Sequence, residues 1–394
     1  MNWIKKCLFT ICFSLCLFTV TMQGQPKLEK EIQGSKLSIT PTGRLAMDVA
    51  VYDEDKTTLS NGAAFSDIRL GFDVFYKKWS ATIDMGFANN KLSPKDIFLQ
   101  YKINNNSHLT AGHIPEPFGL DAMEGASNLR FFTGSASTEA FAPGRKIGIE
   151  YTYYNSYLWT STGFFGDGEG MNGETEGDDG YAVTSRLIFN PLQNKGAIFH
   201  IGLAGSFRKA DANGIDETTN KEKSKSIIYG SPLLTQVKKK DFLNAEITHA
   251  DYQAKYAIEL IAAYGPVALQ GEYFYTNVKR KQDFTSYQAS GAYAQISYIL
   301  LGEKQTYASS VARLGRLKPK DLELVIRYNY TDLDCKHAEI FGGKISDWSL
   351  ALNYQLNKYI AFKLNYSNIK LGKFTPLAAG ERINLFQARA LFVF

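Results

Sequence analysis

The sequence predicts an all-β fold: a transmembrane up-and-down antiparallel β-barrel of about 16 strands with an inward-folded third external loop. Three observations indicate this fold class. Apolar and polar side chains alternate along most of the chain, the connections between the alternating segments are by turns short and long, and the chain ends on an aromatic strand. No stretch reaches the about 20 apolar residues of a membrane-spanning helix, which excludes a polytopic helical membrane protein.

The composition of the 394-residue chain excludes disorder. Aromatic residues make up 13% of the chain, with 26 Phe, 23 Tyr and 4 Trp. Chains that stay disordered contain few aromatic residues, because they cannot bury enough apolar surface to fold. This sequence therefore encodes a packed structure.

Residues 1–25 have the organisation of a secretory signal peptide. Lys5 and Lys6 precede an apolar run over 7–20, and small and polar residues follow it. An N-terminal anchor helix is the alternative, but this run is short for one. We expect 26–42 to be an N-terminal periplasmic lead-in and 43–394 to be the outer-membrane β-barrel.

Export sets the cysteine and charge balance of the mature chain. Three of the four cysteines lie within 1–25, so only Cys335 remains and no internal disulfide is expected. Loss of Lys5 and Lys6 lowers the formal net charge from +5 to +3. That charge is too small to indicate a nucleic-acid partner, and export also argues against one.

Period-two alternation predicts the strands. In 320–332 one face carries apolar and aromatic side chains: Leu322, Leu324, Ile326, Tyr328 and Tyr330. The other face carries polar and charged ones: Glu323, Arg327, Asn329 and Thr331. The same pattern predicts sixteen strands in order, at 43–51, 64–76, 79–89, 95–103, 107–113, 145–154, 157–166, 180–190, 197–208, 250–263, 267–278, 286–301, 320–332, 348–356, 358–366 and 383–394.

The connections alternate in length, as they do in outer-membrane barrels with short periplasmic turns and long external loops. Very short turns are expected at 77–78, 104–106, 155–156, 265–266 and 357–358. Longer polar loops are expected near 52–63, 114–144, 167–179, 209–249, 333–343 and 370–382. Two connections fit poorly, because 90–94 is short for an external loop and 302–319 is long for a periplasmic turn.

A soluble all-β protein, such as tandem sandwiches or a propeller, is the alternative fold. The apolar outer face of each strand favours the membrane, as do aromatic residues beside the short turns, such as Tyr76 and Trp79. The last strand ends at Phe394 and resembles the assembly signal of outer-membrane barrels. We therefore expect a Gram-negative outer-membrane location, with membrane lipid and the barrel assembly machinery as partners.

Charged strand residues should face the lumen, because a Lys or Arg facing lipid at mid-membrane costs about 2–4 kcal/mol. The expected inward basic residues are Arg44, Arg69, Lys102, Lys146, Arg186, Arg208, Lys255, Arg327, Lys363 and Arg389. Nine acidic residues are expected on the same inner face. This near balance fits either a salt-bridged interior or a pore whose selectivity arises at a constriction.

The loop over 114–144 is the candidate constriction. It contains four phenylalanines and ends near Arg145 and Lys146, and such an aromatic loop would be unfavourable in water. Folding into the barrel would bury it. A lid packed outside the barrel mouth is the alternative.

The residues do not indicate an enzyme. The five histidines are scattered without metal-ligand spacing, and no GxSxG, Walker or CxxC motif occurs. We expect no catalytic residue, no cofactor and no metal site. The acidic segment 167–179 could bind Ca²⁺, but its spacing matches no EF-hand loop, and a solvated loop explains it better.

Two segments carry a family resemblance. Residues 112–121, GHIPEPFGLD, resemble the G-x-x-x-x-PFgLe signature of the phosphate-selective porin O and P family. Residues 140–149, AFAPGRKIGI, are similar to the afapgR-x-G-v element of that family. Further matching segments lie at 95–101, 271–273, 293–298, 301–303 and 323–328, so the resemblance spans the mature chain.

The resemblance implies a trimeric porin whose third external loop folds inward. Phosphate-selecting members use Ser and Lys of that loop together with lumenal Arg and Lys. Here Ser127 matches a serine position, whereas Asn128 stands where a lysine is expected and Ala126 where a second serine is expected. Arg130 lies close by and could substitute. The candidates for the pore constriction and anion binding are Ser127, Asn128, Arg130, Arg145 and Lys146.

The sequence therefore predicts an outer-membrane porin, a channel rather than an enzyme, for passive diffusion of small anions such as phosphate or polyphosphate. Expected partners are those anions and two further copies of the chain in a homotrimer. A general, weakly selective porin is one alternative. A barrel that serves as a surface binding scaffold through 209–249 is another, and a barrel enzyme is the third.

Overall fold

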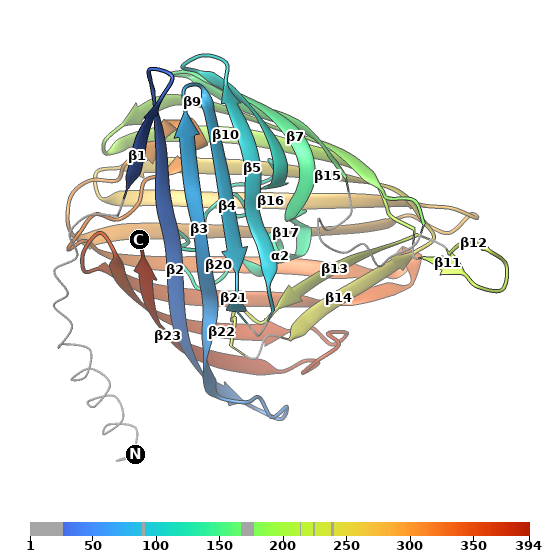
Figure 1. The fold of residues 1–394 in the computed structure, drawn as a ribbon. Coiled ribbons are helices and arrows are strands. Elements are labelled where there is room, and N and C mark those ends of the chain that lie inside the picture. Colours follow the sequence, from blue (N-terminus) through green and yellow to red (C-terminus); the bar gives the residue numbers. More distant parts are fainter. Residues whose placement is uncertain (1–26, 89–90, 167–176, 213, 224, 238–239) are drawn as a thin grey trace.

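A computed structural model describes residues 27–394 apart from 89–90, 167–176, 213, 224 and 238–239. The expected signal peptide and most of the acidic segment 167–179 lie outside the described residues. The described chain forms one antiparallel barrel with segments packed inside it (Figure 1). No helix among these residues is long and apolar enough to cross a membrane.

Within the described residues, sixteen strands form the closed wall, which confirms the predicted number. They are β2 (Ser35–Glu54), β3 (Gly62–Tyr76), β4 (Trp79–Gly86), β5 (Ser93–Lys102), β6 (Ser107–Pro115), β7 (Arg145–Tyr154), β8 (Leu158–Gly166), β9 (Tyr181–Asn194), β10 (Ala197–Lys209), β15 (Ala250–Tyr264), β16 (Val267–Arg280), β17 (Tyr287–Leu301), β20 (Leu322–Cys335), β21 (Ile340–Gln355), β22 (Ile360–Leu371) and β23 (Arg382–Val393). Each strand pairs with the next along the chain, and β23 pairs with β2 to close the ring.

The barrel has a short-turn end and a long-loop end. The short-turn end carries the turns after β3, β5, β7, β9, β15 and β21, together with both termini of the described chain. The long-loop end carries the connections after β2, β6, β8 and β10. The strand β1 (Leu28–Ile32) pairs only with β2, and residues 37–42 of β2 pair with the second half of β3. Strand structure therefore begins earlier than the expected residue 43.

The predicted faces of the strands are confirmed. On β20 the inward Glu323, Val325 and Asn329 are fully buried, whereas the outward Ile326 is 48% exposed. The same alternation repeats around the barrel, so the outer surface is apolar and the charged side chains point inward. A lipid bilayer around the barrel requires this arrangement.

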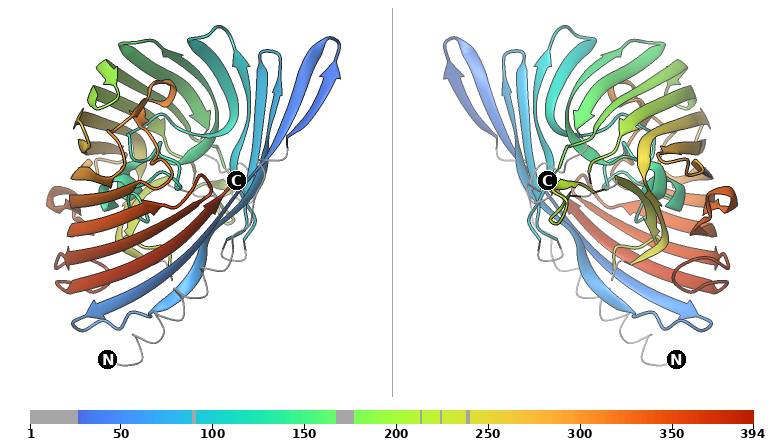
Figure 2. Two further views of the ribbon diagram at one scale, coloured as in Figure 1. Left: turned by 90° about the vertical axis from the view of Figure 1, so that its left-hand side faces the viewer. Right: turned by 90° about the vertical axis from the view of Figure 1, so that its right-hand side faces the viewer.

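Three connections pack inside the ring rather than outside it (Figure 2). We call residues 116–144, which contain α2 (Ala136–Phe141), the lumen loop. The lumen hairpin consists of β13 (Ser226–Pro232) and β14 (Asp241–Thr248). The third, the lumen insert, spans 302–321 and contains β18 (Tyr307–Ala308), η3 (Ser309–Val311) and β19 (Arg313–Leu314).

Two small elements complete the described structure. The hairpin of β11 (Ile215–Asp216) and β12 (Lys221–Glu222) projects away from the barrel at the long-loop end (Figure 1). The short η4 (Lys336–Ala338) joins β20 to β21.

The last residue completes the seam between the first and last barrel strands. The backbone N–H and C=O of Phe394 each bond to those of Gly43 at 3.0 Å. The Phe394 ring lies over Gly43, where a Cβ atom would collide with it. The C-terminal aromatic residue is therefore part of the closure of the ring.

We expect deletion of Phe394 to lower the amount of assembled barrel, because it removes the two seam hydrogen bonds and uncovers Gly43. Heat-modifiable protein in outer-membrane fractions measures the effect. Phe394→Tyr should assemble normally, and Phe386→Ala, which removes another aromatic of the same strand, is the matched control. Equal assembly of the deletion variant and the full chain would contradict a role for Phe394.

Candidate functional site

The lumen loop is fastened to the inner wall of the barrel. The backbone N–H groups of Leu120 and Asp121 donate to the carboxylate of Glu272 on β16, at 2.5 and 2.9 Å. The Ser137 hydroxyl donates to Asn329 Oδ1 on β20 at 2.9 Å. Gly291 on β17 has no side chain, and α2 packs into that space. These partners are all inward-facing residues of the opposite wall.

Aromatic residues of the lumen loop cover arginines of the wall. The guanidinium carbon of Arg327 lies 4.0 Å from the centre of the Phe131 ring, and that of Arg389 lies 4.5 Å from the Phe132 ring. Cation–π contacts of this kind gain strength when they are desolvated. Both phenylalanines are 2% exposed, so the loop buries the aromatic surface that would be unfavourable in water.

The tip of the lumen loop meets the wall through its backbone. Asn353 Nδ2 donates to the carbonyl of Arg130 at 3.0 Å, and the Lys363 ammonium donates to the carbonyl of Leu129. The Arg130 guanidinium lies 3.5 Å from the carboxylate of Glu323 and donates to a carbonyl of the lumen insert, that of Gly315, at 3.3 Å. The Arg130 side chain is therefore engaged in holding two segments together.

The lumen insert enters from the short-turn end and contacts the lumen loop. The Tyr307 hydroxyl lies 2.8 Å from His200 Nδ1, and Trp159 Nε1 donates to the carbonyl of Ser310 at 3.0 Å. Arg313 donates to the carbonyl of Met123 at 3.1 Å. The connection over 302–319, which is longer than a periplasmic turn usually is, thus forms part of the barrel interior.

The lumen hairpin fills the long-loop half of the barrel. Leu243 and Ile247 are fully buried in a cluster that also contains inward residues of β20, β22 and β23. Gln387 of β23 donates to the carbonyl of Leu234 at 3.1 Å. The two strands of the lumen hairpin are therefore packed in the barrel, whereas a surface scaffold through 209–249 would need them to be exposed outside it.

Most of the expected lumenal basic residues are buried. The Arg186 side chain is 1% exposed and pairs with Glu259 at 2.7 Å, and Arg208 pairs with Glu116 of the lumen loop. Arg389 pairs with Asp48 at 2.7 Å through two hydrogen bonds. The buried residues among the expected lumenal basic residues are Arg186, Arg208, Lys255, Arg327, Lys363 and Arg389. Loss of the partner of such a buried charge would be strongly destabilising.

Among the described residues of the barrel strands, the partly exposed lumenal charges lie on β2–β7. Arg44 and Arg69 both pair with Asp67, and Arg69 also pairs with Asp84 at 3.1 Å. Arg145 pairs with Asp96 at 2.9 Å, with side chains that are 32% and 26% exposed. Lys146 on β7 is half-buried, and Lys102 is exposed at the short-turn end of β5. Water therefore reaches the lumen along one arc of the wall.

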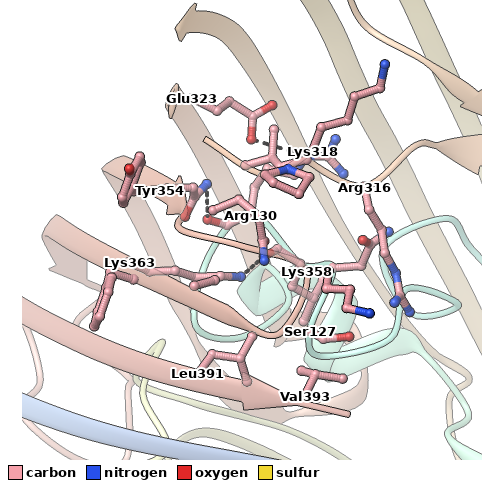
Figure 3. A pocket seen from close by; sticks show the side chains of 18 of the residues that line it. Ser127, Arg130, Arg316, Lys318, Glu323, Tyr354, Lys358, Lys363, Leu391 and Val393 are labelled. Atoms are coloured by element: carbon pink, nitrogen blue, oxygen red, sulfur yellow. Dashed lines mark hydrogen bonds and ion pairs between the residues drawn. The ribbon is translucent and has the colours of Figure 1, made fainter. Parts of the chain in front are cut away.

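Two adjoining cavities open at the short-turn end, between this arc and the inserts. The wall cavity, about 450 Å³, is lined by Arg44, Arg69, Asp73 and Asp84 of the strands. The insert cavity, about 360 Å³, lies between the tip of the lumen loop and residues 315–319. The residues that line both cavities are Ser127, Arg316, Lys358, Tyr359 and Val393. Figure 3 shows Ser127, Arg316 and Lys358 side by side at this site.

Arg316 and Lys358 are cations of the site without a carboxylate partner among the described residues, and Asp73 of the wall cavity is an acidic residue whose carboxylate accepts from the Thr82 hydroxyl at 2.7 Å. Both cations are exposed. Lys318, by contrast, pairs with Glu303 at 2.6 Å. Hydrogen bonds from Lys195 and Lys318 lower the pKa of Glu303 to about 2, so this carboxylate stays ionised at neutral pH and is shared between the two lysines.

The structure brings some of the predicted site residues together. Ser127 lines both cavities, and Asn128 and Arg130 line the insert cavity. Arg145 and Lys146 line neither. The sequence reasoning missed Arg316 and Lys358. The unusual length of the 302–319 connection could have indicated that Arg316 belongs to the site. Lys358 lies in a very short turn, and nothing in the sequence indicated its role.

The positions of the histidines and acidic residues in the described part of the chain bear on metal and catalytic chemistry. Among the described residues, no group of three or more His, Cys, Asp or Glu side chains is arranged to hold a metal ion. His200 lies 2.8 Å from Glu259, but it also contacts Tyr307 and is fully buried without a nucleophile beside it.

Comparisons with known proteins agree with the barrel. The family model described as phosphate-selective porin O and P matches residues 39–394. The chain is similar to Porin O of Pseudomonas aeruginosa, with 22% identity over 95% of this chain and 94% of that protein. Its fold is similar to an anion-selective porin from Comamonas acidovorans, with a TM-score of 0.59 and 13% identity over 91% of this chain and all of that one.

A further structural neighbour is the trimer form of OmpT from Vibrio cholerae. It matches with a TM-score of 0.57 and 11% identity, covering 91% of this chain and 99% of that one. At these identities the structural likeness concerns the fold.

We expect Arg186→Met to destabilise the barrel by about 3–5 kcal/mol, because it removes the arginine that pairs with the buried Glu259 carboxylate and leaves the His200 ring as its remaining contact. Urea unfolding followed by heat-modifiability measures the change. The double variant Arg186→Met, Glu259→Gln should recover part of the loss, and neither variant should change the ion selectivity. A selectivity change in the double variant would contradict a purely structural role for this pair.

Proposed function

The chain belongs to the phosphate-selective porin O and P family, and on that premise we propose that it is a porin for the passive diffusion of small anions. Its family and fold support a channel of the Gram-negative outer membrane rather than an enzyme. The selectivity for anions is our proposal. In it, the short-turn end faces the periplasm and solutes move down their gradient along the wet arc of β2–β7.

The observation that carries the proposal is the pair of cations at the two cavities without a carboxylate partner among the described residues. Coulomb interactions are strongest where a channel is narrow and water is scarce, so a few unpaired charges can outweigh a wall of paired ones. Arg316 and Lys358 can each donate to an anion oxygen, and the Ser127 hydroxyl beside them can add a donor. Both cations stay exposed, so an anion bound there can leave again.

Strict phosphate selectivity is less well supported. Asn128 stands where the family resemblance implies a lysine, and its side chain amide donates to Glu124 at 2.8 Å. Arg130, the nearest alternative donor, is engaged with Glu323 and Gly315. We therefore propose small anions as the solute class, with phosphate as one member of it.

A general, weakly selective porin is the second candidate function. The paired charges of the wet arc favour it, because Arg44, Arg69 and Arg145 each have a carboxylate partner. An arc of this kind exerts little net attraction on either sign of ion. The two candidates differ in whether Arg316 and Lys358 control permeation.

We also propose that the protein assembles as a homotrimer in the membrane. The support is the trimer form of a structural neighbour and the apolar outer face of the barrel, which lies either against lipid or against another copy. The barrel assembly machinery is proposed as a transient partner through the Phe394 seam.

We expect the reconstituted protein to be anion-selective, because unpaired cations control the narrow part of the path. The reversal potential in a KCl gradient across a planar bilayer measures this. The double variant Arg316→Ala, Lys358→Ala should move the reversal potential toward cations. Lys77→Ala, Lys78→Ala, in a neighbouring turn outside both cavities, is the matched control. Cation selectivity of the unmodified protein would refute the proposal and leave the general porin.

We expect replacement of residues 304–317 by a Gly-Asn turn to raise single-channel conductance, because it removes one wall of both cavities. Deletion of 216–221, at the tip of the β11–β12 hairpin outside the barrel, is the control and should leave conductance unchanged. If the first variant conducts like the full chain, the lumen insert does not narrow the path.

A further inference from the structure

The insert cavity has an apolar wall, which an inorganic anion would not use. Its carbon-lined side is formed by Leu129, Leu317, Pro319, Ala361, Leu391 and Val393. Ala361 and Leu391 belong to a small buried cluster with Ala46, against which Val393 packs. This wall is therefore a fixed part of the barrel interior, and Figure 3 shows Leu391 and Val393 beside the cavity.

The charged side of the same cavity is cationic. Arg316 and Lys358 stand where the insert cavity joins the wall cavity. The acidic residue lining the insert cavity, Glu323, is fully buried and pairs with Arg130. A molecule in this cavity thus meets positive charge on one side and hydrocarbon on the other.

This combination suits a solute with one anionic group and an apolar body. A phosphate ion that left water here would lose hydrogen bonds that carbon atoms cannot replace. A carboxylate with a hydrocarbon body can keep its charged group at Arg316 and Lys358 while the body gains from leaving water. The volume of about 360 Å³ lies at the small end of the range for ligand pockets, so the solute is small.

We propose that the insert cavity is a binding site for small organic monocarboxylates with an aliphatic or aromatic body, in preference to inorganic phosphate. This inference rests on the proposed function as an anion porin and names the solute class of that site. Leu317 then acts as a specificity residue, because it reaches the cavity from the lumen insert and contributes to the apolar wall.

Block of chloride current in planar bilayers tests the proposal with the full-length protein. The probes are acetate, butyrate, hexanoate and inorganic phosphate, each titrated at constant ionic strength. Hexanoate should block at a concentration about tenfold lower than acetate, because its extra methylene groups are partly buried. Phosphate should block no better than acetate. Chain length is varied in the solute, so this series needs no variant that might misfold.

Substitutions test separately how the apolar wall and the charges contribute to block. Leu317→Asn should bring the blocking concentrations of hexanoate and acetate together, with little change for acetate. Leu356→Asn, in the neighbouring turn and outside both cavities, is the matched control and should keep the tenfold difference. Arg316→Gln should weaken both carboxylates alike.

The outcomes distinguish this inference from the proposed function. Equal block by acetate and hexanoate, or stronger block by phosphate, in a channel that is anion-selective would overturn the inference and leave the anion porin standing. A cation-selective channel that hexanoate does not block would overturn both.

Discussion

A charged side chain on a membrane-spanning strand has to point into the lumen and find a partner there, and the rest of this structure depends on that constraint. Partners come partly from the wall itself, as in Arg389–Asp48 and Arg186–Glu259. Others come from the lumen loop, which offers Glu116 to Arg208 and the carbonyl of Phe141 to Lys255. The inward position of the loop and the burial of the wall charges therefore stabilise each other.

This division of charges separates a packed side of the lumen from a wet one. From β9 to β23 the inward charges are buried, paired or covered by aromatic rings, and the lumen hairpin fills the space between them. Along β2–β7 the inward charges other than Asp48, which pairs with Arg389 of β23, remain partly exposed. Under the proposed function, the route for solutes is therefore eccentric, and the few side chains that lie where the inserts approach the wet arc would control its selectivity.

The sequence was a good guide to the wall and a poor one to the interior. Alternation around residues such as Glu323 and Ile326 identifies both the strands and their faces, because a two-residue period is a local property. The site also depends on contacts between distant segments. Arg130 has a side chain that could bind an anion, but its pairing with Glu323 could not be predicted from the sequence. Arg316 becomes part of the site only because 302–321 enters the ring, which no local pattern encodes.

The seam between Gly43 and Phe394 has a consequence for the order of folding. The contact joins β2 to the end of β23, and these two segments are far apart in the sequence. The ring can therefore close only after β23 has become available for pairing. The closing strand β23 also contacts the lumen loop through Arg389 and the lumen hairpin through Gln387. Both segments must therefore be in place when the ring closes. Until then the chain has two unpaired strand edges, a state that is prone to aggregation and needs protection during transit.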